Sequence, residues 1–163
     1  MSDDAVVYLA GPVAAYDDGG AAWRDMLIKE YGDEYEFRNP LDKYNVPLEE
    51  LEIVSGASRD GVDKTVGVRE LVENDKRLID ESDGILLGYT AVRSIRTPME
   101  VMYAREREMP VAIWIRDDTE MENLSPWYRY HATAITTAAG MGMTHIENQA
   151  GESPRGVGEV LRT

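Results

Sequence analysis

The sequence contains no cysteine, which excludes disulfide bonds, thiol chemistry and zinc–thiolate sites. Its only histidines, His131 and His145, have no carboxylate at metal-ligand spacing, so we predict no metal site. The chain also lacks a Gly-x-Gly-x-x-Gly turn after its first apolar segment, and it lacks a P-loop. These absences argue against a dinucleotide-dependent or NTP-driven enzyme, and we predict no cofactor.

Long apolar runs are missing as well, and no segment approaches the length of a membrane span. The first residues, Met-Ser-Asp-Asp, carry no basic segment of the kind that opens a secretory leader. We therefore expect a soluble, cytoplasmic protein that does not bind membranes.

Basic residues are few: 17 against 31 acidic ones, for a net charge of −14. Such a surface repels nucleic acid and anionic membranes, so neither is expected as a partner. The only lysines are Lys29, Lys43, Lys64 and Lys76. Acid-rich, lysine-poor surfaces suit concentrated salt, where screening removes the self-repulsion. A halophilic host is one hypothesis, and an acidic protein from an ordinary host is the alternative.

The length of 163 residues and an apolar content of 43% fit a single domain with a hydrophobic core. Short β-branched runs alternate with segments of helical spacing along the chain. Strands are predicted at residues 5–10, 35–39, 84–89, 111–115 and 144–147, and helices at residues 21–31, 68–81, 97–108 and 125–139. This alternation predicts an α/β fold, a doubly wound five-stranded parallel sheet of the flavodoxin-like or Rossmann-like kind.

Two segments lie outside this pattern. Residues 41–67 contain Pro47, an acidic patch and a polar section, and we interpret them as an excursion with a short helix and a possible lid over the site. The tail from residue 151 is polar and glycine-rich. It is expected to be flexible, with at most one helical turn around residues 157–161.

The stretch Thr97-Pro98-Met99-Glu100 follows the third predicted strand and opens a helix. Thr97 can cap this helix, Pro98 suits its first position, and Glu100 then lies within its first turn. Ligands of open α/β sheets bind where strands end and helices begin, so Glu100 is a candidate nucleophile. The alternative is a capping box, in which Glu100 only bonds back to the Thr97 amide. The local pattern alone favours the box.

Three motifs together resemble the nucleoside 2-deoxyribosyltransferase family, which includes the 2′-deoxynucleoside 5′-monophosphate N-glycosidases. They are Tyr8-Leu9-Ala10-Gly11-Pro12, then Asn74-Asp75 followed by Ile79, Ser82 and Asp83, and finally Thr97-Pro98-Met99-Glu100 with Tyr103-Ala104. The resemblance extends from Val6 to about Trp127. It implies an enzyme that cleaves or transfers at the N-glycosidic bond of a 2′-deoxynucleoside or its 5′-monophosphate, through a glycosyl-enzyme intermediate.

The resemblance also implies roles for individual residues. Glu100 matches the nucleophile, Tyr8 the tyrosine that lies against it, and Asp75 the aspartate that protonates or holds the base. Gly11 belongs to the first motif and is expected at the substrate. Each assignment has an alternative: Tyr8 as an ordinary half-buried strand tyrosine and Asp75 as an exposed helix acid.

The segment Asn123-Leu124-Ser125-Pro126-Trp127 resembles one that a subunit of this family contributes to its neighbour's site. This implies that Asn123 and Ser125 bind substrate across an interface and that the chain forms a homo-oligomer with shared sites. The alternative is that Ser125 only caps the helix opened by Pro126.

Two positions depart from the usual pattern of the transferases. Ser94 stands where they carry an aspartate, as in the monophosphate N-glycosidases, and Arg96 stands where a glycine is more usual. Arg93, Ser94 and Arg96 could form a phosphate cradle before a helix N-terminus, or the arginines could simply meet nearby acids. Pro12-Val13-Ala14-Ala15 replaces the glycine- and serine-rich loop of the monophosphate enzymes and weakens the phosphate hypothesis.

Two alternatives to an enzyme stay open for the whole chain: a non-catalytic nucleotide-sensing domain and a purely structural domain.

Overall fold

The structure is a computed structural model that describes residues 4–12, 21–41, 52–54, 65–90, 94–116, 118–150 and 159–160. Its main sheet has the strand order β2-β1-β5-β6-β7-β8, and every neighbouring pair runs parallel. The strands are β1 (Val6–Ala10), β2 (Glu36–Arg38), β5 (Gly84–Tyr89), β6 (Val111–Ile115), β7 (Ala134–Thr136) and the two-residue β8 (Glu159–Val160). The first five strands confirm the predicted doubly wound parallel sheet, and β8 extends its edge.

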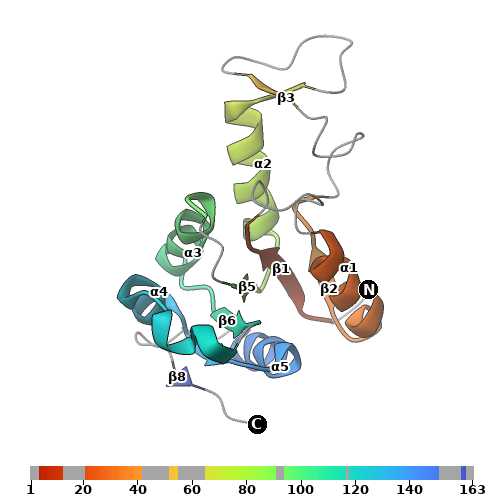
Figure 1. The fold of residues 1–163 in the computed structure, drawn as a ribbon. Coiled ribbons are helices and arrows are strands. Elements are labelled where there is room, and N and C mark those ends of the chain that lie inside the picture. The colour runs from red at the N-terminus through yellow and green to blue at the C-terminus, as the bar shows by residue number, and fades with distance from the viewer. Residues whose placement is uncertain are drawn as a thin grey trace.

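Helices cover both faces of this sheet, as Figure 1 shows. The helices are α1 (Ala21–Tyr31), α2 (Val68–Asp80), α3 (Arg96–Glu106), α4 (Pro126–His131) and α5 (Ala139–Gln149), and a short 3₁₀ helix spans Asp118–Asn123. Helices α1 and α5 pack on one face, and α2, α3 and α4 pack on the other. In the described part of the chain, no helix is long and apolar enough to cross a membrane.

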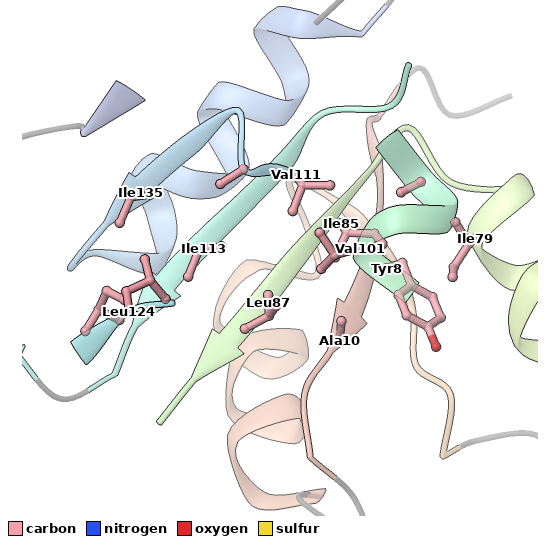
Figure 2. Close-up of a cluster of buried hydrophobic side chains, with 13 residues drawn as sticks. Tyr8, Ala10, Ile79, Ile85, Leu87, Val101, Val111, Ile113, Leu124 and Ile135 are labelled. Atoms are coloured by element: carbon pink, nitrogen blue, oxygen red, sulfur yellow. The ribbon is translucent and has the colours of Figure 1, made fainter. Parts of the chain in front are cut away.

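The side-chain alternation of β1 divides the core between the two faces. Val7 and Leu9 pack with Trp23 and Leu27 of α1, whereas Tyr8 packs with residues of α2 and α3. Figure 2 shows the second cluster, with Tyr8 on the side of the sheet that carries Ile79 and Val101. Because successive strand residues point to opposite faces, the position of Tyr8 in β1 directs its ring toward α3.

The carboxyl-terminal half of the sheet differs from the prediction. The helix expected over residues 125–139 ends at His131, and residues 134–136 form β7 instead. The strand expected over residues 144–147 is part of α5. Thr144 and Ile146 mimic strand alternation, but Met143 and Ile146 are both buried at a spacing of three residues, which is the helical spacing. The β-branched Ile135 and Thr136 pair with β6.

The lid and the tail fall mostly outside the described residues. Within the predicted lid, β3 (Glu52–Val54) and β4 (Thr65–Gly67) form a separate two-stranded parallel sheet, and β4 leads directly into α2. Within the tail, the sequence predicted a helical turn around residues 157–161. This prediction is wrong for residues 159–160, which form β8 and pair with β7. Pairing to an exposed sheet edge satisfies backbone groups that an isolated turn would leave to water.

Candidate active site

The sequence-predicted catalytic residues meet above the carboxyl end of β1. In a sheet of this order, β1 and β5 are neighbours whose following segments lead to opposite sides, which makes their carboxyl ends the point where such folds bind ligands. Tyr8 comes from β1, Asp75 from α2, and Arg96 and Glu100 from α3. The fold thus brings together side chains that are far apart in the sequence.

Arg96 joins the two acidic residues of this cluster. Its Nε donates to Glu100 Oε1 at 2.8 Å, and its Nη2 lies 3.0 Å from Asp75 Oδ2. The side chains of Asp75 and Glu100 are each 9% exposed, and that of Arg96 is 32% exposed. Asp75 is therefore not the exposed helix acid of the alternative interpretation, and Arg96 meets nearby acids rather than open solvent.

The two carboxylate oxygens of Glu100 differ in their hydrogen bonding, since only Oε1 accepts a bond from Arg96. Among the described residues, Glu100 Oε2 is buried and has no hydrogen-bond partner, and the same is true of the Tyr8 hydroxyl. The two groups are close: besides burial, the charge of Glu100 raises the pKa of Tyr8, and the Tyr8 hydroxyl lowers that of Glu100 as a hydrogen-bonding neighbour, although no hydrogen bond of good geometry joins them. Buried polar atoms without partners are rare in folded proteins and cluster where a ligand or a reaction needs them.

Burial dominates the titration of these groups. Burial raises the pKa of Glu100, the Asp75 carboxylate raises it further, and the Arg96 guanidinium opposes both. Burial and the carboxylates of Glu100 and Asp75 together hold the pKa of Tyr8 well above its usual range. For Arg96, burial lowers the pKa, but the two carboxylates outweigh it, so the pKa rises and the guanidinium stays charged.

The capping-box interpretation of Glu100 is wrong. Helix α3 begins at Arg96, so Thr97 lies inside it and is not its N-cap. The Thr97 amide donates to Ser94 Oγ at 3.2 Å, and the Thr97 hydroxyl donates to the same oxygen at 2.8 Å. Since the Thr97 amide is bonded to Ser94, Glu100 is not needed to satisfy it.

Three of the remaining predicted substrate residues line a cavity next to the Glu100 cluster. A cavity of about 960 Å³ between α3 and α4 is lined by Ser94, Asn123 and Ser125, and its described lining residues include no aspartate, glutamate, lysine or arginine. Thr97 and Val101 of α3 face this cavity, whereas Arg96 and Glu100 pair on the side of α2. Glu100 does not line the cavity, but its neighbour Val101 does, and so does Tyr128, whose pKa is raised by burial and, in part, by the charge of Glu100. The cavity therefore adjoins the Glu100 cluster.

Ser125 has a structural role that the sequence predicted as an alternative. Its Oγ accepts a hydrogen bond from the Trp127 amide at 3.1 Å, and Pro126 occupies the first turn of α4, so Ser125 caps this helix. Its contact with a substrate, like that of Asn123, stays a prediction. Arg93 of the proposed phosphate cradle lies outside the described residues.

Gly11 lies at the end of β1 and packs tightly. A Cβ at this position would lie 2.9 Å from a ring carbon of Trp23, and the Gly11 carbonyl accepts a hydrogen bond from Arg24 Nη2 at 3.1 Å. Glycine is needed here because the indole ring lies directly against the backbone.

Arg24 is a residue of this region that the sequence analysis did not assign. It is fully buried, its Nε donates to the Leu9 carbonyl at 3.2 Å, and burial lowers its pKa to about 10. Its guanidinium also lies 4.5 Å from the centre of the Trp23 ring. The signal was present in the helical spacing, since Arg24 is three and four residues before Leu27 and Ile28 on the inward face of α1.

Two comparisons with known proteins bear on the identity of the chain. No protein-family model matches the chain, and no curated protein matches it. The function is therefore argued from the geometry of the site.

Proposed function

We propose that the chain cleaves or transfers at the N-glycosidic bond of 2′-deoxynucleosides or their 5′-monophosphates, with Glu100 as the nucleophile. One observation carries this proposal: a buried carboxylate whose Oε1 is held by Arg96 keeps its Oε2 without a partner, beside an unpartnered tyrosine hydroxyl. The large majority of buried side-chain oxygens with a structural role are hydrogen-bonded, so this exception supports a functional role for Glu100. The position above the ends of β1 and β5 and the motif resemblance both agree with a site at this place.

The chemistry follows from this arrangement in two displacements. Glu100 Oε2 attacks C1′ of the deoxyribose, the C1′–N bond breaks, and its electron pair leaves with the base, which takes up a proton. Water or a second base then attacks C1′ and releases the Glu100 carboxylate. A carboxylate under the ring also stabilises the positive charge that develops on the sugar.

Asp75 and Tyr8 assist in this scheme. Asp75 is the second carboxylate of the cluster and is bonded to Arg96 through Oδ2; in this scheme it holds the departing base or delivers its proton, as the resemblance implies. The Tyr8 hydroxyl is a donor that stays un-ionised, because its pKa is raised by burial and by the two acids. It can therefore donate a hydrogen bond to Glu100 when the Glu100 carboxylate regains its negative charge in the second displacement.

The sensing-domain alternative depends on an arginine that is available to a phosphate. Arg96 Nε and Nη2 are instead bonded to Glu100 and Asp75, and the described lining of the cavity beside Ser94 carries no arginine or lysine. This arrangement favours the enzymatic proposal, and we do not adopt the alternative.

The test is base release, followed by chromatography, from a panel of deoxynucleosides and their 5′-monophosphates, with and without an acceptor base and with and without molar KCl. Glu100→Gln should lower the rate by about 10³-fold or more, because an amide is a poor nucleophile. Glu106→Gln changes an exposed acid of the same helix and should match the unmodified protein. Full activity of Glu100→Gln would sink the assignment of the nucleophile.

A further inference from the structure

Arg96 makes contacts that its motif position does not explain. It lies one helical turn before Glu100 on α3, so the bond from Nε to Oε1 closes within one helix. The bond from Nη2 to Asp75 Oδ2 then crosses from α3 to α2. One guanidinium therefore fixes both acids of the cluster relative to each other.

We propose that Arg96 is a positioning residue, which holds Glu100 so that Oε2 and not Oε1 is the attacking oxygen. This inference rests on the proposed function. The two oxygens of a carboxylate exchange by rotation about a single bond, and the 2.8 Å bond to Oε1 opposes that rotation. The directional bond to a planar guanidinium also fixes the plane of the carboxylate. The oxygen left over is the one that has no partner among the described residues.

The charges around Glu100 assign a second part of this role to Arg96. Besides Arg96, the ionisable groups that face Glu100 come from four elements: Tyr8 of β1, Arg24 of α1, Asp75 of α2 and Tyr128 of α4. Within the described part of the chain, Arg96 is the only cation that donates a hydrogen bond to Glu100. Arg24 donates to the Leu9 and Gly11 carbonyls.

A nucleophilic carboxylate must be ionised, and here burial opposes ionisation. Burial and Asp75 raise the pKa of Glu100, while the Arg96 guanidinium lowers it. Without Arg96, Glu100 would hold its proton to a higher pH. Arg96 therefore supports the reaction by keeping the carboxylate ionised as well as by orienting it.

This role differs from that of a phosphate ligand. A guanidinium that binds the 5′-phosphate interacts with the monophosphate alone, so its loss would weaken binding of the monophosphate and not that of the deoxynucleoside. A positioning guanidinium never contacts the phosphate, and its loss lowers kcat for both substrates. The two roles are thus separated by comparing a deoxynucleoside with its own 5′-monophosphate.

The first experiment measures kcat and KM of base release against pH for Arg96→Met and Arg96→Lys. The acid limb of the kcat–pH profile should move to higher pH in Arg96→Met. At a fixed acidic pH on this limb, kcat should fall about tenfold for each unit by which the pKa rises. KM should change alike for both substrates, and Arg96→Lys should restore part of the rate because it keeps the charge. An unmoved acid limb, or a rise of KM confined to the monophosphate, would overturn the positioning role.

The matched control is Arg69→Met. Arg69 also pairs with a glutamate one turn away, Glu73, at 3.1 Å, but on the exposed surface of α2. Its replacement should leave kcat, KM and the acid limb unchanged, because an exposed ion pair contributes little. A control that shifted the acid limb as Arg96→Met does would show a general charge effect and would also overturn the proposal.

A second experiment needs no activity: urea unfolding of the unmodified protein, Arg96→Met, Glu100→Gln and the double variant at a series of pH values. Because the folded-state pKa of Glu100 is raised, its contribution is present below the unfolded pKa and is lost as the pH rises through the folded one. Arg96→Met raises that pKa further. The unfolding constant of Arg96→Met, relative to that of the unmodified protein, should grow about tenfold per pKa unit as the pH rises. This growth should be smaller in the Glu100→Gln background, where of the two acids only Asp75 loses its bond to Arg96.

The outcomes of the two experiments separate the claims. An unmodified protein that releases no base overturns the proposed function and, with it, the attacking-oxygen assignment. Active protein whose Arg96→Met and Glu100→Gln effects on unfolding are independent overturns the control of Glu100 by Arg96 and leaves the proposed function standing.

Discussion

At the scale of single residues, the site is defined by two oxygen atoms that the fold leaves unsatisfied. Glu100 Oε2 and the Tyr8 hydroxyl are buried and have no partner among the described residues. A buried polar atom without a partner destabilises the folded state by about 1–3 kcal/mol. Such atoms at one place are expected of a site whose partner is the substrate.

The Tyr8→Phe variant tests whether the unsatisfied Tyr8 hydroxyl lowers the stability of the protein while supporting its activity. Its free energy of unfolding should stay the same or rise by about 1 kcal/mol, because the ring is kept and an unsatisfied hydroxyl is removed. Its rate of base release should fall, because the donor beside Glu100 is lost. Urea unfolding and chromatography of the released base measure the two effects.

Tyr103→Phe is the matched control. The Tyr103 hydroxyl donates a hydrogen bond to the Asp80 carboxylate at 2.8 Å. Removing this hydroxyl should lower the free energy of unfolding by about 0.5–1.5 kcal/mol. It should leave the rate of base release unchanged. If Tyr8→Phe destabilised the protein as much as the control and left the rate unchanged, Tyr8 would be an ordinary core tyrosine.

The sequence predicted some of these residues better than others. Tyr8, Asp75 and Glu100 were assigned from motifs of the resemblance, and the structure brings their side chains to one cluster, whereas their catalytic roles stay predictions. The partners of Arg96 could not be predicted, since they depend on the direction of a long side chain between α2 and α3. Arg24 was missed because a buried arginine is rare and only its place on the inward face of α1 marks it.

At the scale of elements, the central strands and the edge strand β2 were predictable, and the carboxyl-terminal side of the sheet was not. Strands β1, β5 and β6 are apolar runs buried on both faces, a pattern typical of central parallel strands. Strand β7 has three residues and α4 has six, lengths at which strand and helix patterns overlap. The start of α3 was misplaced by two residues, since Ile95 and not Thr97 precedes its first turn, and that shift decided whether Thr97 and Glu100 could form a capping box.

Close packing of elements makes a prediction at Gly84, the first residue of β5. A Cβ there would lie 2.8 Å from the Pro110 carbonyl oxygen and 2.7 Å from a methyl carbon of Ile146, so the start of β6 would have to move. Gly84→Ala should therefore lower the free energy of unfolding by about 1–3 kcal/mol, as measured by urea unfolding.

Gly140→Ala provides the comparison in α5. The nearest atom to a Cβ at Gly140 is the Tyr31 hydroxyl at 3.3 Å, which belongs to a half-buried side chain, and alanine favours the helix by about 0.5–1 kcal/mol. This variant should be close to neutral or slightly more stable. Equal losses in the two variants would show that β5 and β6 do not need the close approach at Gly84.

At the scale of the whole molecule, the fold places the reactive cluster and the large cavity on neighbouring flanks of α3. Helix α3 packs between α2 and α4 (Figure 1), so Glu100 faces α2 while Ser94, Asn123 and Ser125 line the cavity beside α4. The sequence predicted all of these residues for one site, because order along the chain does not show which flank of a helix each residue takes. A shared site between subunits, as the resemblance implies, stays a prediction.

The measurement that tests the central claim most directly is the mass of the whole chain after a rapid acid quench during turnover of a deoxynucleoside, followed by peptide mapping. The account predicts a population heavier by one deoxyribosyl group, with the added mass on the peptide that contains Glu100 and no such population in Glu100→Gln. Base release without any adduct, or an adduct on a peptide that lacks Glu100, would contradict it.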